Sequence, residues 1–390
     1  MSRDPTVLAF VNENITGDVA SLGLRYSGKV AFQLPAVLEW LDALQRGKDK
    51  LPNWVDRRCV FTRRSMEQAS SEMTAQQKIR ELNGDRILNL CGGIGVDDAA
   101  FARCFKEVVS VEMDEEVHEL ALVNMKKLGI QNIRRVLNEA GQFLEDESET
   151  YDWIFADPDR RESGKRFVQM CDCSPEIIPL WSLIQNKSKR QLIKLSPLYP
   201  LEQLEQELPG IYRIEVVAWK GEVKEVLAYC ETGYSGEVSR KAIELDPYQS
   251  FKGKPAANKS WAMPDKTYFY EVHPSLSKSG LASSYAESIG TEVLISNGIY
   301  QQSDQLIPSF FGREFIQIHR SAYSRKKFDQ YLKDQSIQQA NLASRFFKWS
   351  PQELKKLHRL KDGGRDYFFF FENSERKPYF IHGRKLDDIG

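Results

Sequence analysis

The middle of the chain alternates between short apolar runs and longer segments with helical spacing. Five runs have the composition and length of buried β-strands: RILNL (86–90), EVVSVEM (107–113), IRRVLN (133–138), YDWIFA (151–156) and RQLIKLS (190–196). Helical patterns such as DEEVHELALVNMKKLG separate them. This alternation predicts βαβ units, and therefore a parallel sheet with helices on both faces. Two further runs, YRIEVVAW and KEVLAYCE, predict an antiparallel hairpin at the edge of this Rossmann-like module, which spans about residues 70–235.

Different patterns flank this module. Residues 5–50 have apolar residues at helical spacing, with a kink or break at Pro35, and residues 65–82 predict one amphipathic helix. Residues 252–266 are polar and contain proline, which is typical of a linker or an exposed loop. The remainder predicts strand followed by helix twice and then two strands around a charged turn, so we expect small α+β units after residue 265.

Length and composition narrow the class of protein. A chain of 390 residues exceeds one ordinary core, which favours two or three domains. Lys and Arg total 54 against 55 Asp and Glu, so the overall charge favours no polyanionic partner. The six cysteines lack paired metal-ligand spacing, which predicts a reduced, cytoplasmic protein without a metal site. We also expect a soluble protein, because no apolar run approaches the roughly 18 residues that a membrane span needs.

Positive charge is concentrated near the C-terminus. Residues 320–390 contain 16 Lys and Arg against 9 Asp and Glu, a net charge of +7, together with many aromatic residues. Such a segment fits a solvated small domain with an ordinary excess of charge. It fits an RNA-binding appendage equally well, because positive side chains bind phosphates and aromatic rings stack on bases.

A glycine-rich turn follows the first of the five strands. In ILNLCGGIGVDDAAFA, Gly93 and Gly95 let the backbone approach a ligand, and the next helix presents free N–H groups. A dinucleotide fingerprint would need a small residue in place of Asp98, so a pyrophosphate is disfavoured, whereas a cationic or hydroxyl-rich ligand suits a carboxylate. Glu112 ends the next strand, 17 residues after Gly95, where it can accept both hydroxyls of a ribose. Together these features favour S-adenosylmethionine (SAM) as the ligand.

The strand at residues 151–156 ends in Asp-Pro followed by basic residues. Ligands of open α/β sheets bind outside the carboxyl ends of the strands, so we expect Asp157 beside the reactive methyl group, with Pro158 stiffening the turn. Asp157 can accept a hydrogen bond from an acceptor NH or OH group. Arg160 and Arg161 can bind a phosphate or carboxylate of the substrate. In the structural alternative, Asp157 only caps the turn and the arginines are solvated.

Neighbouring residues bear on the acceptor. Enzymes that methylate amino groups of adenine usually have proline and an aromatic residue where this chain has Asp159 and Arg160, so a flipped adenine is not specified. The uridine-C5 mechanism needs a cysteine nucleophile near the fifth strand, and IKLSPLYP contains Ser196 and no cysteine, which disfavours that mechanism. Lys194 and Ser196 either line the acceptor pocket or have a role at the edge of the core.

Residues 68–230 resemble a class I SAM-dependent methyltransferase. The glycine-rich turn, the strand ending in Glu112, LNEAGQFL and FADPDRR match the cofactor loop, ribose site, adenine site and catalytic motif of that family. The resemblance implies a seven-stranded, mostly parallel sheet and SAM as cofactor, although Asn89 replaces the usual acid and Cys91 the first glycine of the loop. The candidate cofactor-binding residues are Asn89, Cys91, Gly92, Gly93, Gly95, Asp97, Glu112, Met113, Asn138, Glu139 and Asp157. The candidate catalytic residues are Asp157, Pro158, Arg160, Arg161, Lys194 and Ser196.

The whole chain is similar to a bacterial methyltransferase group with a DPxRR motif. The matching stretches are LPNWVDRRCVFTRRSMEQASSEMTAQQK, DPDRR, IKLSP, FYEVHPSLSKSGL and RFFKWSPQELKKLHRLKDGGRDYF. The similarity implies four parts, namely an N-terminal helical segment (1–68), a methyltransferase core (69–240), a small ferredoxin-like unit (265–320) and a THUMP-like domain (321–390).

The leading hypothesis is a SAM-dependent methyltransferase that acts on structured RNA, ribosomal or transfer RNA, recruited by the C-terminal units. RNA is favoured by the THUMP-like resemblance, the local positive charge and the arginines near the site. Neither DNA nor a membrane is expected as a partner. Two alternatives stay open: methylation of a protein or small molecule, and an RNA-binding protein whose methyltransferase core is degenerate. The sequence specifies neither the modified nucleotide nor the oligomeric state.

Overall fold

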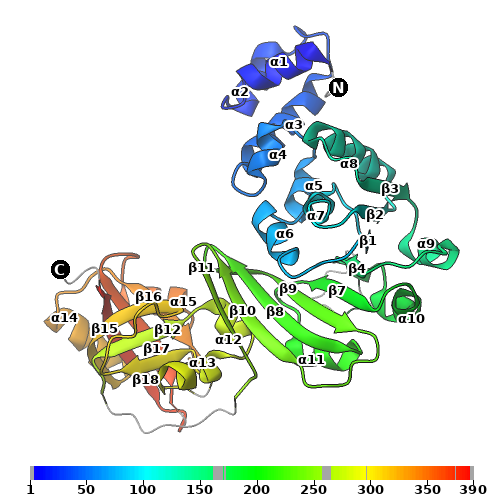
Figure 1. Ribbon diagram of the computed structural model, residues 1–390. Coiled ribbons are helices and arrows are strands. Elements are labelled where there is room, and N and C mark those ends of the chain that lie inside the picture. The colour runs from blue at the N-terminus through cyan, green and yellow to red at the C-terminus, as the bar shows by residue number, and fades with distance from the viewer. Residues whose placement is uncertain are drawn as a thin grey trace. The chain divides into compact units, whose positions relative to one another are not determined.

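The computed structural model describes residues 4–160, 170, 173–256, 265–295, 297–373 and 375–386, with backbone but no side chains for residues 159 and 160. The chain divides into two compact units (Figure 1). The first unit comprises Met1–Arg213 and Lys224–Glu237, and the second comprises Ile214–Val223 and Val238–Gly390. Within the described ranges, no helix has both the length and the apolar character needed to cross a membrane.

The first unit begins with short helices. They are α1 (Pro5–Glu13), α2 (Val19–Tyr26), α3 (Leu34–Gly47), α4 (Pro52–Asp56), α5 (Arg63–Gln68) and α6 (Glu72–Lys78). The expected kink or break at Pro35 is a break, because Pro35 lies in the first turn of α3, where its missing N–H costs no hydrogen bond. Trp40 is almost fully buried, and its indole N–H donates to the carbonyl oxygen of Cys59 at 2.8 Å.

The prediction of one helix over residues 65–82 is wrong. Helix α5 ends at Gln68, and α6 begins at Glu72 with Ser71 as its N-cap. The Ser71 hydroxyl oxygen accepts a hydrogen bond from the backbone N–H of Thr74 at 3.1 Å. A serine that bonds to a nearby backbone N–H competes with a continuous helix. The break places Ser70 in the turn between the two helices.

A mostly parallel sheet forms the centre of the first unit. Six of the nine strands of this sheet are β1 (Arg86–Asn89), β2 (Glu107–Glu112), β3 (Ile133–Leu137), β4 (Trp153–Ala156), β7 (Arg190–Leu195) and β9 (Glu222–Glu231). Strands β3, β2, β1, β4 and β7 lie in that order and pair in parallel, and β9 pairs with β7 in the antiparallel sense. The predicted α/β, Rossmann-like fold is therefore confirmed. The division between the units passes through β8 (Ile211–Trp219) and the start of β9.

Helices connect the parallel strands. They are α7 (Val96–Phe101), α8 (Glu115–Leu128), α9 (Ala140–Asp146), α10 (Ile177–Lys187) and α11 (Leu201–Glu207). Apolar side chains of α3, α7 and α8 share one core. The parallel strands all end at one edge of the sheet, where a short ribbon of β5 (Asp159–Arg160) and β6 (Cys173–Ser174) follows β4. We call this edge the carboxyl edge, formed by residues 89–95, 112–113, 137–139, 157–158 and 194–198.

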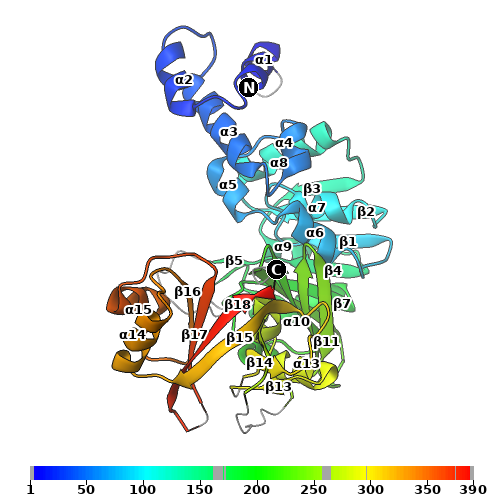
Figure 2. The same ribbon diagram turned by 90° about the vertical axis from the view of Figure 1, so that its left-hand side faces the viewer.

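A seven-stranded sheet dominates the second unit (Figure 2). Its strands are β12 (Tyr268–Val272), β13 (Glu292–Val293), β14 (Tyr300–Ser303), β15 (Gly312–Ala322), β16 (Asn341–Arg345), β17 (Asp366–Glu372) and β18 (Pro378–Lys385). Their order is β13-β14-β12-β15-β18-β17-β16, and only the pair β16–β17 is parallel. Residues expected in a ferredoxin-like unit and residues expected in a THUMP-like domain therefore contribute strands to the same sheet.

In the described part of the second unit, four helices and a hairpin accompany this sheet. They are α12 (Pro274–Lys278), α13 (Ala282–Ile289), α14 (Arg325–Asp334), α15 (Pro351–His358), and the antiparallel strands β10 (Ser239–Leu245) and β11 (Tyr248–Gly253). The core beneath α14 is aromatic, with Phe328 packed edge-on against Phe368 and Phe370 of β17. Aromatic pairs in this arrangement stabilise a core beyond their buried area.

Candidate functional site

The glycine-rich turn joins β1 to α7 at the carboxyl edge. Gly93 and Gly95 have φ angles of +52° and +94°, in the left-handed region that favours glycine. A Cβ atom added to Gly93 would meet no heavy atom within 4 Å, so the turn is open on that side. A ligand can therefore approach the backbone here, as the sequence predicts.

A buried ion pair lies beneath the turn. Asp98 is fully buried, and its carboxylate accepts hydrogen bonds from Arg135 Nη1 at 2.6 Å and from the Ser110 hydroxyl at 2.7 Å. Arg135 also donates through Nη2 to the carbonyl oxygen of Gly93 at 2.9 Å. The expectation that the Asp98 carboxylate faces a ligand is therefore wrong, because its oxygens hold the turn in place from below.

Asn89 and Cys91, the two departures from the family pattern, are built into the turn. The Asn89 amide accepts from the N–H of Cys91 at 3.0 Å and donates to Asp98 at 2.6 Å, so both ends of the amide have partners within the protein. Burial raises the pKa of the Cys91 thiol well above its ordinary value, and the carboxylate of Asp157 raises it further. The thiol stays protonated and is a poor nucleophile.

Gly92 offers a steric test of the turn. A Cβ atom there would lie 2.2 Å from Arg135 Nη1 and 2.5 Å from the Ser110 hydroxyl oxygen. We expect Gly92→Ala to displace the turn and to weaken SAM binding about tenfold, measured by calorimetric titration. Gly23→Ala is the control, because its added Cβ would approach only the Leu38 side chain, at 3.4 Å. Equal affinities of Gly92→Ala and wild type would contradict the role given to this turn.

Two backbone N–H groups hold the carboxylate of Glu112 in place at the end of β2. One carboxylate oxygen accepts from Gly93 at 2.7 Å and the other accepts from Asp114 at 2.9 Å. Each oxygen of an ionised carboxylate has about two acceptor positions, so both can accept one more hydrogen bond, as from a pair of ribose hydroxyls. The position of Glu112 thus fits its predicted role.

Apolar and polar side chains surround Glu112 on the neighbouring strand ends. Met113 is 65% exposed and Leu137, at the end of β3, is 47% exposed. Asn138 follows Leu137 and accepts the backbone N–H of Glu139 at 2.8 Å, and the exposed Glu139 carboxylate does not cap α9. An adenine has flat apolar faces and a polar rim. The apolar side chains here fit its faces, and the polar side chains fit its rim. Sequence reasoning missed Leu137, although an apolar residue at a strand end is a readable signal.

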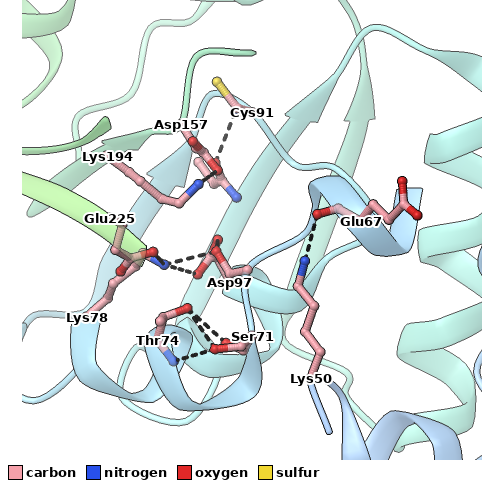
Figure 3. Close-up of polar contacts among 12 residues, drawn as sticks. Lys50, Glu67, Ser71, Thr74, Lys78, Cys91, Asp97, Asp157, Lys194 and Glu225 are labelled. Atoms are coloured by element: carbon pink, nitrogen blue, oxygen red, sulfur yellow. Dashed lines mark hydrogen bonds and ion pairs between the residues drawn. The ribbon is translucent and has the colours of Figure 1, made fainter. Parts of the chain in front are cut away.

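The predicted catalytic residue Asp157 lies at the end of β4, next to β7. Its carboxylate accepts a hydrogen bond from Lys194 Nζ at 2.5 Å (Figure 3). Burial lowers the pKa of Lys194, but Asp157, Glu225 and Asp97 outweigh this effect and raise that pKa well above its ordinary value. Lys194 therefore stays cationic. The Asp157 side chain is 25% exposed, so a substrate can reach it.

The other predicted catalytic residues lie outside the Asp157–Lys194 ion pair. The Ser196 hydroxyl oxygen accepts from the backbone N–H of Leu198 at 3.2 Å, which shapes the loop after β7. Pro158 is half-buried at the carboxyl edge. The backbone of Arg160 is part of β5, while its side chain and the whole of Arg161 lie outside the described residues. Phosphate binding by the two arginines stays a prediction.

A buried lysine that sequence reasoning missed joins three segments beside the turn. Lys78 is fully buried, and its Nζ donates to Asp97 and Glu225, each at 3.0 Å (Figure 3). The same Nζ donates to the Ser70 hydroxyl oxygen, also at 3.0 Å. The Ser70 hydroxyl also donates to Asp97 at 2.7 Å. Burial raises the pKa of Glu225, and Lys78 opposes that rise. Because both oxygens of Asp97 have partners, this predicted cofactor-binding residue fixes the start of α7 from below the turn.

Two family models match parts of the chain. Residues 62–172 match the family described as conserved hypothetical protein 95, and residues 312–385 match the THUMP domain-like family. The first match covers the glycine-rich turn, Glu112 and Asp157, and the second covers β15 to β18 of the second unit.

The chain is also similar to individual proteins, some over most of its length and one over about a third. An uncharacterized S-adenosylmethionine-dependent methyltransferase of Mycobacterium tuberculosis is 22% identical over 303 residues, which are 77% of this chain and 81% of the relative. The protein-L-isoaspartate O-methyltransferase of Thermotoga maritima is 29% identical over 136 residues, 34% of this chain and 40% of the relative. A crystal structure of a proposed methyltransferase from Porphyromonas gingivalis W83 has a TM-score of 0.86 and 24% identity and covers 98% of both chains, which shows the fold.

Proposed function

We propose that the chain, an S-adenosylmethionine-dependent methyltransferase, transfers a methyl group to a nucleotide of structured RNA, either ribosomal or transfer RNA. The observation that carries this proposal is the THUMP domain-like match over residues 312–385, in the same chain as the methyltransferase core. The net charge of +7 in residues 320–390 supports an RNA partner, because RNA is a polyanion. We place the enzyme in the cytoplasm, where free thiols such as those of Cys91 and Cys104 stay reduced.

The residues at the carboxyl edge have separate roles in this reaction. When bound, SAM supplies an electrophilic methyl group on its sulfonium. Glu112 would hold the ribose hydroxyls, and Met113 and Leu137 would cover the adenine. Asp157, held by Lys194, accepts a hydrogen bond from the acceptor NH or OH group and takes the proton that this group loses. SAM held at this edge would supply the methyl group and retain the sulfur's electron pair, while the residues of the chain orient the acceptor and receive its proton.

Methyl transfer to RNA can be measured directly. The purified protein is incubated with methyl-labelled SAM and total RNA from cells that lack its gene, with RNase-treated and protease-treated arms. We expect label in large RNA that RNase removes and protease does not. Label that survives RNase and is lost with protease would contradict the RNA acceptor and favour a protein acceptor.

Phe346 is a candidate RNA contact in the second unit. It follows β16, is 65% exposed and has a φ angle of +51°, which is strained for an aromatic residue. Lys348 lies close by in the chain, with Nζ 4.9 Å from the centre of the Trp349 ring. We expect Phe346→Ala to weaken RNA binding about tenfold in a filter-binding assay, because a stacking partner is lost.

A matched variant separates this contact from general surface effects. Tyr248 of β11 is a 44% exposed aromatic residue in the same unit, and we expect Tyr248→Ala to bind RNA like wild type. Phe346→Trp should also bind normally, since it keeps the ring. Equal losses for Phe346→Ala and Tyr248→Ala would contradict a specific stacking role.

A further inference from the structure

Three exposed large apolar side chains of the first unit lie at the carboxyl edge. Among the described residues of that unit, those exposed are Leu24, Met113, Leu122, Leu137, Ile178 and Leu198. Met113, Leu137 and Leu198 lie at or just beyond the ends of β2, β3 and β7. One exposed leucine is ordinary on a protein surface. Three apolar side chains at the ligand-binding edge of an α/β sheet indicate contact with what binds there.

Leu198 lies on a different half of this edge from the other two. Met113 follows β2 and Leu137 ends the neighbouring strand β3, beside the predicted ribose carboxylate. Leu198 follows β7, which is separated from β2 by β4 and β1. On the same strand, Lys194 holds Asp157, the predicted acceptor of the substrate proton. Leu198 is therefore placed to contact the methyl acceptor rather than the nucleoside of the cofactor.

The loop after β7 holds Leu198 in a fixed position. The backbone N–H of Leu198 donates to the Ser196 hydroxyl oxygen at 3.2 Å, and the N–H of Tyr199 donates to the Ser196 carbonyl oxygen at 3.0 Å. Tyr199 is fully buried and anchors the turn, and residues 197 and 200 are prolines, which restrict the backbone. Even so, the Leu198 side chain is 68% exposed. A contact surface fixed in this way loses little conformational entropy on binding.

We propose that Leu198 packs against the face of the nucleobase that accepts the methyl group, an inference that rests on the proposed RNA function. A nucleobase combines an apolar face with a hydrogen-bonding edge, and flipped bases are held between apolar side chains while their edges are read by polar groups. Leu198 supplies the apolar contact and Asp157 the polar one. A ribose hydroxyl or a phosphate has no such face. Methylation is therefore placed on the base.

Kinetics with three variants test the contact. We expect Leu198→Ala to lower kcat/KM for RNA about tenfold, mainly through a higher KM, because a buried apolar contact is lost. Leu198→Met keeps most of the apolar surface and should stay close to wild type. Leu122→Ala removes a 41% exposed leucine from α8 and should change nothing. All three variants should bind SAM with unchanged affinity. A Leu198→Ala enzyme with wild-type kcat/KM would overturn the inference.

The position of the methyl group gives a second, independent readout. RNA labelled by the wild-type enzyme is digested to nucleosides, and the labelled nucleoside is cleaved into base and ribose. Label on the base is the expected result, and label on the ribose would overturn the inference while leaving RNA methylation intact. If the wild-type enzyme transfers no label to RNA at all, the proposed function and this inference are both overturned.

Discussion

Replacing Asp157 by alanine is expected to lower kcat for methyl transfer about 1,000-fold, because the group proposed to orient the acceptor and take its proton is lost. The variant also removes the carboxylate that Lys194 Nζ contacts at 2.5 Å, and so it changes the charge around this half-buried lysine. Single-turnover transfer of labelled methyl groups, with saturating SAM, measures the chemical step without interference from product release.

Two further variants define what Asp157 does. Asp146→Ala removes an exposed carboxylate from α9 whose hydrogen bond comes from Gln142 of the same helix, and it should keep full activity. Asp157→Asn keeps the shape and a hydrogen-bond acceptor but cannot take a proton, so its activity should lie between those of wild type and Asp157→Ala. A rate for Asp157→Ala within tenfold of the Asp146→Ala rate would show that Asp157 only caps the turn.

Replacing Lys78 by methionine is expected to destabilise the protein by about 3–5 kcal/mol, because two carboxylates lose the cation that compensates them. Lys78 is fully buried, and the side chains of Asp97 and Glu225 are only 11% and 2% exposed. Methionine has a similar volume, so the loss would come from charge rather than from a cavity. Urea unfolding followed by circular dichroism gives the free energy of unfolding of each variant.

An exposed lysine provides the matched control. Lys106 pairs with Asp85 at 2.9 Å, but its side chain is 78% exposed, and Lys106→Met should cost less than about 1 kcal/mol. Adding Glu225→Gln to Lys78→Met removes one uncompensated charge and should restore part of the lost stability. Equal stabilities of Lys78→Met and Lys106→Met would show that the buried network contributes nothing.

The central sheet could be predicted because its signal is local. Strands β1, β2, β4 and β7 are mostly buried, so each reads as a short run made up mainly of apolar residues. Strand β11 alternates between exposed and half-buried residues, which leaves no such run, and sequence analysis assigned it no strand. The break between α5 and α6 was missed because the residues on both sides favour a helix, and the pattern of apolar residues does not reveal that Ser71 caps a new helix.

In the candidate site, too, residues with a local sequence signal could be predicted and residues paired over long distances in the sequence could not. Glu112 and Asp157 follow directly from strand ends, since parallel strands bring their carboxyl ends to one edge. The bond from Lys78 to Glu225 joins residues 147 positions apart, and no local pattern specifies such a pair. The sequence suggested that Asp98 faces the ligand, because its actual partner could not be recognised there. That partner, Arg135, lies on β3, 37 positions along the chain. The sequence therefore predicts the residues on the proposed ligand side of the site, whereas the buried residues that support them are visible only in the fold.

Calorimetric titration of the purified protein with SAM tests whether the carboxyl edge of the central sheet binds this cofactor. We expect one SAM site per chain with micromolar affinity. We also expect at least about tenfold weaker binding for Glu112→Ala, because hydrogen bonds from the ribose hydroxyls to a carboxylate are lost. No heat of binding with the wild-type protein would contradict the account and would favour an RNA-binding protein with a degenerate methyltransferase core.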